Sequence, residues 1–211
     1  MSAPASSRAG RPANPGLRSN ILDAALELFS ERGYDATAIS QVVERAGVTK
    51  GALYHYFQKK EDLLYEIYRT LLDEQLADLD EIIAKQNDPV QTLREIIEDL
   101  VITTIKHLKA VIVSSRYDAQ FSEQRWRTLQ ADWRHYQDVV RTLIRTGQED
   151  GVFTRTVSPE LASWMIFGLN PTLPNWYRVD GPKTPQELAR EASTFILAAL
   201  QTGAPREAGA R

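Results

Sequence analysis

The 211-residue sequence contains no cysteine. Disulfide bonds, thiolate zinc sites and a cysteine nucleophile are therefore excluded. No stretch approaches the roughly 18 consecutive apolar residues that a membrane-spanning helix requires. The first residues are rich in Ala, Ser, Pro and Gly and lack the apolar segment of a secretory signal. We therefore expect a cytoplasmic protein with no membrane partner.

Signatures of several enzyme classes are missing as well. The sequence has no G-x-S-x-G, P-loop or G-x-G-x-x-G motif, so hydrolase, NTPase and dinucleotide-binding activities lack their motifs. Its three histidines, His55, His107 and His135, do not have the spacing of a zinc site. Asp132, His135 and Asp138 come nearest to a metal site, but a solvated helix face explains them better. We expect no enzymatic activity, no metal and no cofactor.

The charge of the chain is unevenly distributed. With 43% hydrophobic and 25% charged residues, the composition is that of an ordinary globular protein. Residues 1–60 contain eight Lys and Arg against five Asp and Glu, whereas the remainder contains 17 against 23. A polyanionic partner is therefore expected to meet the first third of the chain.

Apolar residues recur at helical spacing from Leu17 onward, and signals for β-strands are nearly absent. We predict an all-α fold of about nine helices, with a three-helix headpiece followed by a helical bundle. Ser158-Pro159 and Thr184-Pro185 each place an N-cap residue before a proline, which marks the start of a helix. The expected organisation is a flexible tail over residues 1–16, the headpiece over 17–60, the bundle over 61–202 and a second flexible tail over 203–211.

Residues 37–57 predict a helix-turn-helix unit. A short amphipathic helix is expected to begin with Thr37 as its N-cap and to end at Ala46, before the breaker Gly47. A second short helix is expected over residues 49–56. In a helix-turn-helix unit the second helix enters the major groove of DNA, so this helix is the candidate for DNA recognition.

The second helix and the residues just beyond it carry side chains that suit DNA. They comprise a hydroxyl and a long cation at the N-terminus of the helix, a glycine that allows close approach, two rings directed to the sugar-phosphate rim, and a lysine past the end. These residues are Thr49, Lys50, Gly51, Tyr54, His55 and Lys60. Spacing and charge alone are also compatible with a simple corner in a helical bundle.

Three runs in the first third follow one family pattern. They are Leu28-Phe29 with Gly33-Tyr34 and Thr37, then Ala46-Gly47-Val48-Thr49-Lys50-Gly51 with Leu53-Tyr54-His55-Tyr56-Phe57, and then Lys60-Glu61-Asp62-Leu63. Over residues 17–64 the chain resembles the TetR family of bacterial transcriptional regulators. The resemblance implies a homodimer that binds a palindromic operator in double-stranded DNA, usually as a repressor that a small molecule releases.

The same resemblance implies roles for individual residues. The recognition helix from Thr49 to Tyr54 reads the groove in this family. Ala38 departs from the pattern, because the family often has Thr or Ser there, and one phosphate contact is therefore expected to be missing. The positions that typically contact phosphates are Thr37, Tyr54, His55 and Lys60.

Aromatic and polar residues converge between positions 116 and 178, and all four tryptophans lie there. Because a buried indole N–H needs a hydrogen-bond partner, such clusters suit pockets with one wet side. A plain core or a dimer interface is the alternative for each of these residues. The expected ligand-binding residues are Arg116, Trp133, Trp164, Phe167, Asn170, Trp176 and Arg178.

The effector is suggested by a second, weaker resemblance. Phe167-Gly168-x-Asn170, followed by Asn175-Trp176-Tyr177-Arg178 and Gly181-Pro182, resembles the C-terminal signature of FadR-like, acyl-CoA-responsive TetR regulators. This likeness covers about residues 126–200 and implies an acyl-CoA effector in lipid or sterol catabolism. Many relatives have Trp at Pro171 and Arg at Asn175. Because proline interrupts a helix, Pro171 is expected to end or kink the helix after Asn170.

Two other functions are compatible with the same residues. One is a multidrug- or metabolite-responsive regulator whose Trp-rich cavity holds a lipophilic aromatic ligand. The other is a helical ligand-binding protein that does not bind DNA.

Under the favoured interpretation, apolar stripes on the last two helices form a dimer contact. The residues of these stripes are Ala162, Met165, Ile166, Leu188, Ala192, Phe195, Ile196 and Ala199.

Overall fold

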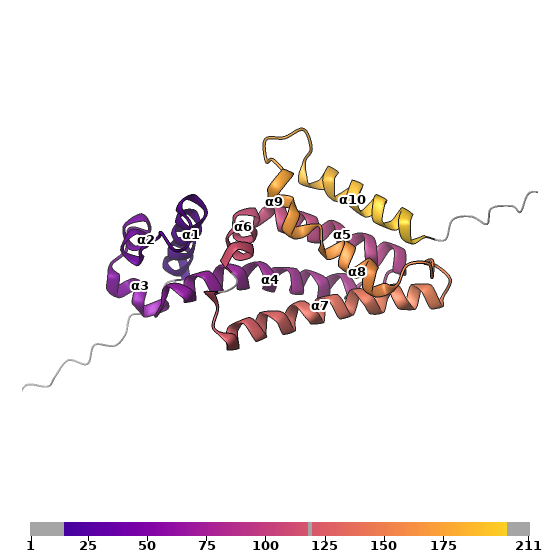
Figure 1. The fold of residues 1–211 in the computed structure, drawn as a ribbon, viewed down its shortest axis with the longest axis horizontal. Coiled ribbons are helices and arrows are strands. Elements are labelled where there is room, and N and C mark those ends of the chain that lie inside the picture. Colours follow the sequence, from indigo (N-terminus) through magenta and orange to yellow (C-terminus); the bar gives the residue numbers. More distant parts are fainter. Residues whose placement is uncertain (1–14, 118–119, 202–211) are drawn as a thin grey trace, which may run out of the picture.

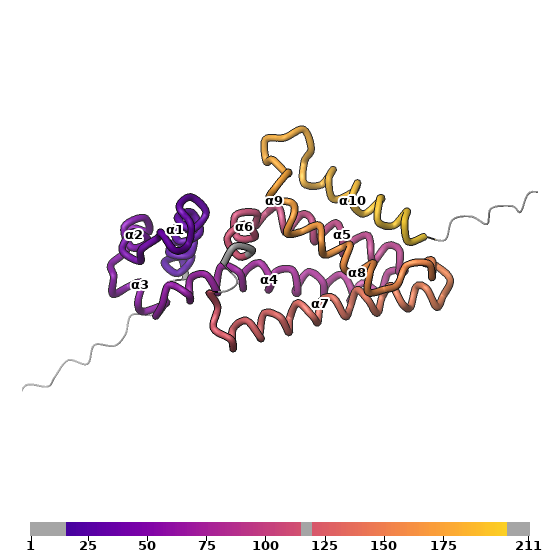
Figure 2. The backbone as a smooth tube through the Cα atoms, viewed as in Figure 1, coloured from indigo at the N-terminus to yellow at the C-terminus, as the bar shows by residue number. Residues whose placement is uncertain are grey.

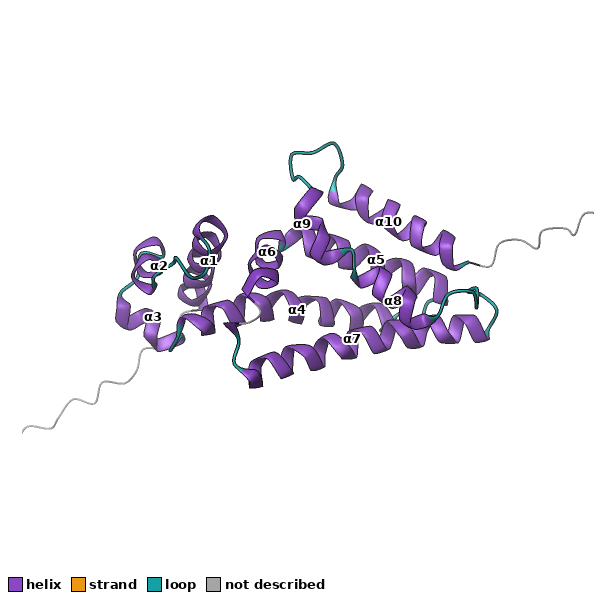
Figure 3. Ribbon diagram, in the orientation of Figure 1, coloured by secondary structure: helices purple, strands orange, loops and turns teal. Residues whose placement is uncertain are grey.

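The structure, a computed structural model, describes residues 15–117 and 120–201. Regular structure within these ranges is helical, apart from one isolated antiparallel bridge between Phe153 and Gln201 (Figure 3). The all-α prediction is confirmed. The predicted tails lie outside the described residues except near Pro15, where the first helix begins. No helix in the described ranges is both long and apolar enough to cross a membrane.

The helices form two parts that are joined by one long helix. Figure 1 shows α1, α2 and α3 grouped at one end, while α4 leads from them into the body, where α7 runs alongside it. The helices are α1 (Pro15–Arg32), α2 (Ile39–Arg45), α3 (Lys50–Tyr56), α4 (Lys60–Ala84), α5 (Pro89–Lys106), α6 (Leu108–Tyr117), α7 (Glu123–Glu149), α8 (Pro159–Phe167), the 3-10 helix η2 (Asn170–Thr172), α9 (Leu173–Trp176) and α10 (Pro185–Leu200).

The headpiece of α1 to α3 is held together by one apolar core. Ile21, Leu28 and Phe29 of α1 are fully buried. They belong to the same cluster as Leu53 of α3 and Phe57, which follows α3. Because Leu53 and Phe57 lie four residues apart, both point inward, and the opposite face of α3 is left to solvent.

The body has its own core, built from α4, α5, α7, α8 and α10. Ile96 of α5, Tyr136 of α7 and Ile166 of α8 are completely buried within it. Near the end of α7, the Phe153 ring packs so close to Gly147 that a Cβ atom there would overlap the ring. The backbone tube in Figure 2 shows α10 on the outside of the body beside α5.

Helix caps agree with the sequence at three places and differ at one. The Thr49, Ser158 and Thr184 hydroxyls each accept a backbone N–H at the start of α3, α8 and α10. Thr37, however, is not the N-cap of α2, because Ala38 holds that position. The Thr37 hydroxyl donates instead to the carbonyl of Gly33, 2.8 Å away, at the end of α1.

Two helix boundaries also differ from expectation. The apolar stripe over residues 93–108 is divided, since α5 ends at Lys106 and α6 begins at Leu108. Helix α8 ends at Phe167, three residues before Asn170, after which Pro171 was expected to end or kink it, and Pro171 lies in the 3-10 helix η2. A proline lacks the N–H that an α-helix would use, so the chain after α8 continues as short turns.

Candidate DNA-binding surface and ligand cavity

The exposed face of α3 carries most of the predicted DNA-binding residues. Thr49, Lys50, Gly51, Tyr54 and His55 are all exposed. The Lys50 ammonium lies 5.8 Å from the centre of the Tyr54 ring, and Lys50 makes no ion pair within the described residues. A Cβ at Gly51 would meet only the Thr49 hydroxyl, at 4.0 Å, so the surface there is open. The structure therefore brings these five residues together on one accessible face.

Lys60 and Thr37 lie apart from that face. Lys60 is half-buried, and its ammonium lies 4.2 Å from the centre of the Tyr34 ring and 3.4 Å from the carbonyl oxygen of Asp35. Burial lowers the pKa of Lys60, while the charge of Asp35 acts in the opposite direction. Thr37 is only 2% exposed, and its hydroxyl already donates to the end of α1. The hydroxyl of Thr37 is thus committed inside the headpiece rather than offered to a phosphate.

A cavity of about 270 Å³ opens in the body between α4, α6 and α7. Its wall is largely apolar and aromatic, and none of the described residues that line it carries a charge. The lining consists of Tyr68, Leu71, Gln75, Thr104, Val111, Ser114, Phe121, Trp126, Trp133, Gln137, Phe167, Asn170 and Pro171. Such a concave, mostly apolar space with a few polar groups is typical of a small-molecule site.

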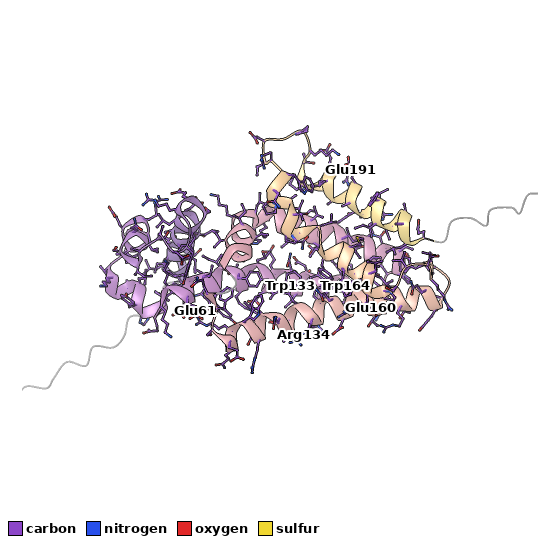
Figure 4. All side chains as sticks on the ribbon, in the orientation of Figure 1. Glu61, Trp133, Arg134, Glu160, Trp164 and Glu191 are labelled. Atoms are coloured by element: carbon purple, nitrogen blue, oxygen red, sulfur yellow. The ribbon has the colours of Figure 1, made fainter. Side chains whose placement is uncertain are left out.

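Three of the predicted ligand-binding residues meet in this cavity. The rings of Trp133 and Phe167 pack edge to face, with 5.8 Å between their centres. The Trp133 indole N–H donates to the Tyr68 hydroxyl, which provides the polar partner that a buried indole requires. Asn170 completes this side of the cavity. Figure 4 labels Trp133 on α7.

Trp164, Trp176 and Arg178, which were also predicted to bind the ligand, are not among the described residues that line the cavity. Trp164 is 61% exposed because Ile166 and Phe167 take the inward positions of α8. Trp176 is 51% exposed, and the Arg178 guanidinium donates to the Tyr177 carbonyl. Arg116 lies in α6, but its side chain is outside the described part of the chain.

Sequence reasoning missed the contributions of α4 and α6 to the cavity. Tyr68, Leu71 and Gln75 come from α4, and Ser114 comes from α6. Gln75 offered a signal in hindsight, since it is a polar residue within the apolar stripe of α4 between Leu72 and Leu79. Gln75 is nevertheless almost completely buried.

Three polar side chains of the cavity wall have an unsatisfied oxygen. Gln75 Oε1, Ser114 Oγ and Asn170 Oδ1 are buried and have no hydrogen-bond partner among the described residues. The Gln75 amide nitrogen lies 3.5 Å from the Thr104 hydroxyl, which leaves its oxygen free. An unpaired buried polar group costs about 1–3 kcal/mol of folding free energy. A bound ligand that supplied partners would therefore gain from these atoms.

An aromatic cluster connects the cavity to the start of α7. Phe121 and Trp126, which both line the cavity, stack with 6.3 Å between ring centres. Phe121 also lies 6.2 Å from the rings of Tyr65 and Tyr68 on α4. A ligand that moved Phe121 would therefore disturb the contact between α4 and the beginning of α7.

Hydrogen bonds and an ion pair link the start of α7, next to this aromatic cluster, to the start of α4 beside the headpiece. The Ser122 backbone N–H donates to Glu61 Oε1 at 2.9 Å, and Arg125 Nη2 donates to Asp62 Oδ1 at 2.6 Å. Asp62 also accepts the backbone N–H of Lys59 at 2.7 Å, which caps α4 just after α3 ends. Glu61 is labelled near the start of α4 in Figure 4. These residues form one continuous connection between the cavity and the recognition helix.

These contacts change the acidity of both carboxyl groups. Burial by itself would raise the pKa of Asp62, but the Lys59 N–H and Arg125 outweigh it, and the pKa is lowered. Burial likewise would raise the pKa of Glu61, but hydrogen bonds from Ser122 and the guanidinium of Arg125 lower it below its ordinary value. Both groups are thus held as carboxylates at neutral pH.

The apolar stripes of α8 and α10 are divided between the core and the surface. Ala162 and Ile166 are buried within the protomer, whereas Met165 is 66% and Phe195 is 78% exposed. Leu161 and Trp164 of α8 are also exposed. The outward face of these two helices is therefore apolar and uncovered in the single chain. The stripe residues of α10 at 188, 192 and 196 are half-buried.

Replacing Arg125 with Gln tests the connection at the start of α4. The lowered carboxylate pKa values stabilise the folded state above about pH 4, and this contribution is lost as the pH falls through them. Arg125→Gln should therefore reduce the free energy of unfolding by about 1–3 kcal/mol near neutral pH and flatten its fall in acid. Urea unfolding followed by circular dichroism at a series of pH values measures both effects.

Arg127→Gln is the matched control. Arg127 lies on the same helix, and its ion pair with Glu123 is fully on the surface, with both side chains more than two-thirds exposed. Surface pairs of this kind contribute little. Equal losses of stability and unchanged acid dependence in the two variants would contradict the proposed role of Arg125.

Two family models match this chain. The one described as "Bacterial regulatory proteins, tetR family" matches residues 21–67, and the one described as "Tetracyclin repressor-like, C-terminal domain" matches residues 86–200. The first range contains α2, α3 and the start of α4, and the second contains most of the body. The second match by itself spans more than half of the chain.

Individual proteins of this kind are similar along most of their length. The HTH-type transcriptional repressor KstR2 of Rhodococcus jostii (strain RHA1) is 29% identical over 190 residues, which are 88% of this chain and 91% of that protein. The TetR family transcriptional regulator PfmR of Thermus thermophilus has a solved structure with a TM-score of 0.78, 29% identity, and coverage of 86% of this chain and 99% of that one. AibR, solved in complex with isovaleryl coenzyme A and operator DNA, has the same fold, with a TM-score of 0.74, 23% identity, and coverage of 86% and 97%.

Proposed function

This chain belongs to the TetR family of bacterial regulatory proteins, and from that premise we propose that it is a ligand-responsive transcriptional repressor. It binds a palindromic DNA operator as a homodimer and leaves the operator when a small molecule fills the cavity of the body. The observation that carries this proposal is the continuous connection from the cavity through Phe121 and Arg125 to the start of α4, directly after the recognition helix.

DNA recognition is assigned to the exposed face of α3. Lys50 and Gly51 lie at the N-terminal end of α3, which is where side chains of a recognition helix reach base edges. Tyr54 and His55 contact the phosphate rim from the next turn. Lys60 reaches a phosphate only by leaving the Tyr34 ring, so we assign it a weaker, sequence-independent contact.

Lys50→Ala should relax sequence preference as well as weaken binding. Loss of a base contact costs about 1–3 kcal/mol of discrimination between operator variants. Lys60→Ala, by contrast, should weaken all sequences alike and reduce the salt dependence of binding. Fluorescence anisotropy titrations of a set of operator variants at several salt concentrations measure both quantities.

Lys85→Ala is the control for these titrations, since Lys85 lies at the far end of α4 and pairs with Glu95. It should leave operator binding unchanged. An unchanged ranking of operator variants in Lys50→Ala would show that Lys50 does not contact bases. Binding without any salt dependence would contradict the repressor assignment as a whole, because phosphate neutralisation releases counterions.

Dimerisation is assigned to the uncovered apolar face of α8 and α10. Large exposed side chains such as Trp164, Met165 and Phe195 are unusual on the surface of a monomer. A two-fold contact through this face would supply the second headpiece that a palindrome requires, with half-sites about one helical turn apart, ~34–36 Å.

Phe195→Asp should convert the dimer to a monomer, because it places a charge at the centre of the apolar face. Sedimentation velocity or light scattering at micromolar concentration measures the mass. Gln186→Asp, on the exposed side of the same helix, adds the same charge outside the stripe and should remain dimeric. A wild-type protein that is monomeric under these conditions would rule out the dimer.

An acyl-CoA thioester is the effector that the cavity and the fold favour. The apolar wall suits an acyl group, which gains about 0.8 kcal/mol for each buried CH₂. The nucleotide part of CoA needs cations for its phosphates. A shallow groove on α7 shares Trp133 and Gln137 with the cavity and adds the exposed Arg134 (Figure 4). AibR, a protein of this fold, was solved with isovaleryl coenzyme A.

Operator release by acyl-CoAs, free fatty acids and aromatic drugs tests the effector class. Acyl-CoAs should release the operator, and the free acids should do so poorly because they lack the phosphates. Arg134→Ala should raise the acyl-CoA concentration required by about tenfold, which corresponds to loss of one charge-assisted contact. Arg127→Ala is the control on the same helix. Release by a drug or a free acid but by no acyl-CoA would favour the lipophilic-ligand alternative.

A further inference from the structure

The cavity wall carries more polar groups than a hydrocarbon chain needs. Gln75, Ser114 and Asn170 are each more than nine-tenths buried, and each has an oxygen with no hydrogen-bond partner in the part of the chain that the structure describes. They come from three separate elements, α4, α6 and η2, and they line the same space. Half of the six unpaired buried oxygens among the described residues belong to residues that line this one cavity, whereas buried polar groups in folded proteins are ordinarily paired.

The chemistry of these groups restricts what fits beside them. The unpaired amide oxygens of Gln75 and Asn170 can only accept a hydrogen bond, whereas the Ser114 hydroxyl can donate or accept, so the ligand group that satisfies them must be a donor such as a hydroxyl. A plain alkyl chain would leave all three oxygens buried and unpaired. The flat faces of Trp133 and Phe167 meanwhile provide apolar contact for the rest of the ligand.

We propose that Gln75, Ser114 and Asn170 are specificity-determining residues that select an acyl group bearing a hydroxyl over a plain hydrocarbon of the same size. The oxygen lies between α4, α6 and η2, and the carbon skeleton lies against Trp133 and Phe167. The described lining residues carry no charge, so the selected oxygen belongs to a neutral group. The acyl-CoA form of the ligand rests on the proposed function, whereas the selection depends on the cavity alone.

Matched pairs of ligands test this selection. The probes are cyclohexanecarbonyl-CoA with its ring-hydroxylated counterpart, and octanoyl-CoA with an octanoyl-CoA that carries a hydroxyl group within the chain. Isothermal titration calorimetry with the full-length protein in the absence of DNA should give about a tenfold lower Kd for the oxygenated member of a pair. Equal Kd values within both pairs would overturn the proposal.

Variants locate the selection in the three residues. Gln75→Leu and Asn170→Leu should each bring the two Kd values within a pair to about the same value, mainly by weakening the oxygenated ligand. Both variants should also raise the Tm of the unliganded protein, because each removes an unpaired buried oxygen. Ser114→Ala removes the hydroxyl of the third residue and should reduce the difference between the two Kd values by a smaller amount. Retained preference in all three variants would overturn the assignment of these residues.

Gln130→Leu is the matched control, since Gln130 lies in the adjoining groove and not in the cavity. It should keep the tenfold preference. The near-isosteric Asn170→Asp is avoided because it would add a charge.

A CoA-free pair separates this inference from the proposed effector. Cyclohexanol and methylcyclohexane enter the cavity without any phosphate contact, and thermal shift measures each. Stabilisation by cyclohexanol but not by methylcyclohexane, with no effect of any acyl-CoA, would support the selection and contradict the acyl-CoA effector. Equal stabilisation by both compounds, together with operator release by acyl-CoAs, would contradict the selection and support the acyl-CoA effector.

Discussion

The capped start of α4 is the constraint on which the relation between headpiece and body depends. Asp62 accepts the Lys59 N–H and the Arg125 guanidinium at the same time, so one carboxylate both begins the helix and binds it to α7. Helix α3 ends only a few residues earlier, so this junction lies directly beside the candidate DNA-binding helix. Arg18 of α1, paired with Glu66 of α4, stabilises the same junction from the headpiece side.

The cavity lies where its occupancy acts on that junction. Phe121 and Trp126 belong both to the cavity wall and to the segment that leads into α7. Because close-packed interiors transmit strain, displacement of these rings by a ligand would be felt at the start of α7. Under the proposed function, a higher affinity of the effector for the state that does not fit the operator would shift the population towards that state.

The headpiece was largely predictable, because local signals specify it. Thr49 as an N-cap, Gly47 in the turn and the inward pair Leu53 and Phe57 are properties of a short stretch of sequence. The cavity was only partly predictable. Trp133, Phe167 and Asn170 were identified from composition, whereas Gln75 and Ser114 come from helices distant in sequence. Trp164 and Trp176 were identified by residue type, yet they face outward.

Most of the helices, most of their caps and the family to which the chain belongs could be predicted from the sequence, because periodicity, N-cap residues and the turn glycine act over a few residues. Only the tertiary structure decided which side chains meet. It turned the Thr37 hydroxyl into the headpiece, placed Lys60 against Tyr34, and enclosed Gln75 with Ser114 and Asn170. These outcomes depend on the rotation and crossing of packed helices, and helical periodicity specifies which face of a helix is apolar but not which neighbour covers it.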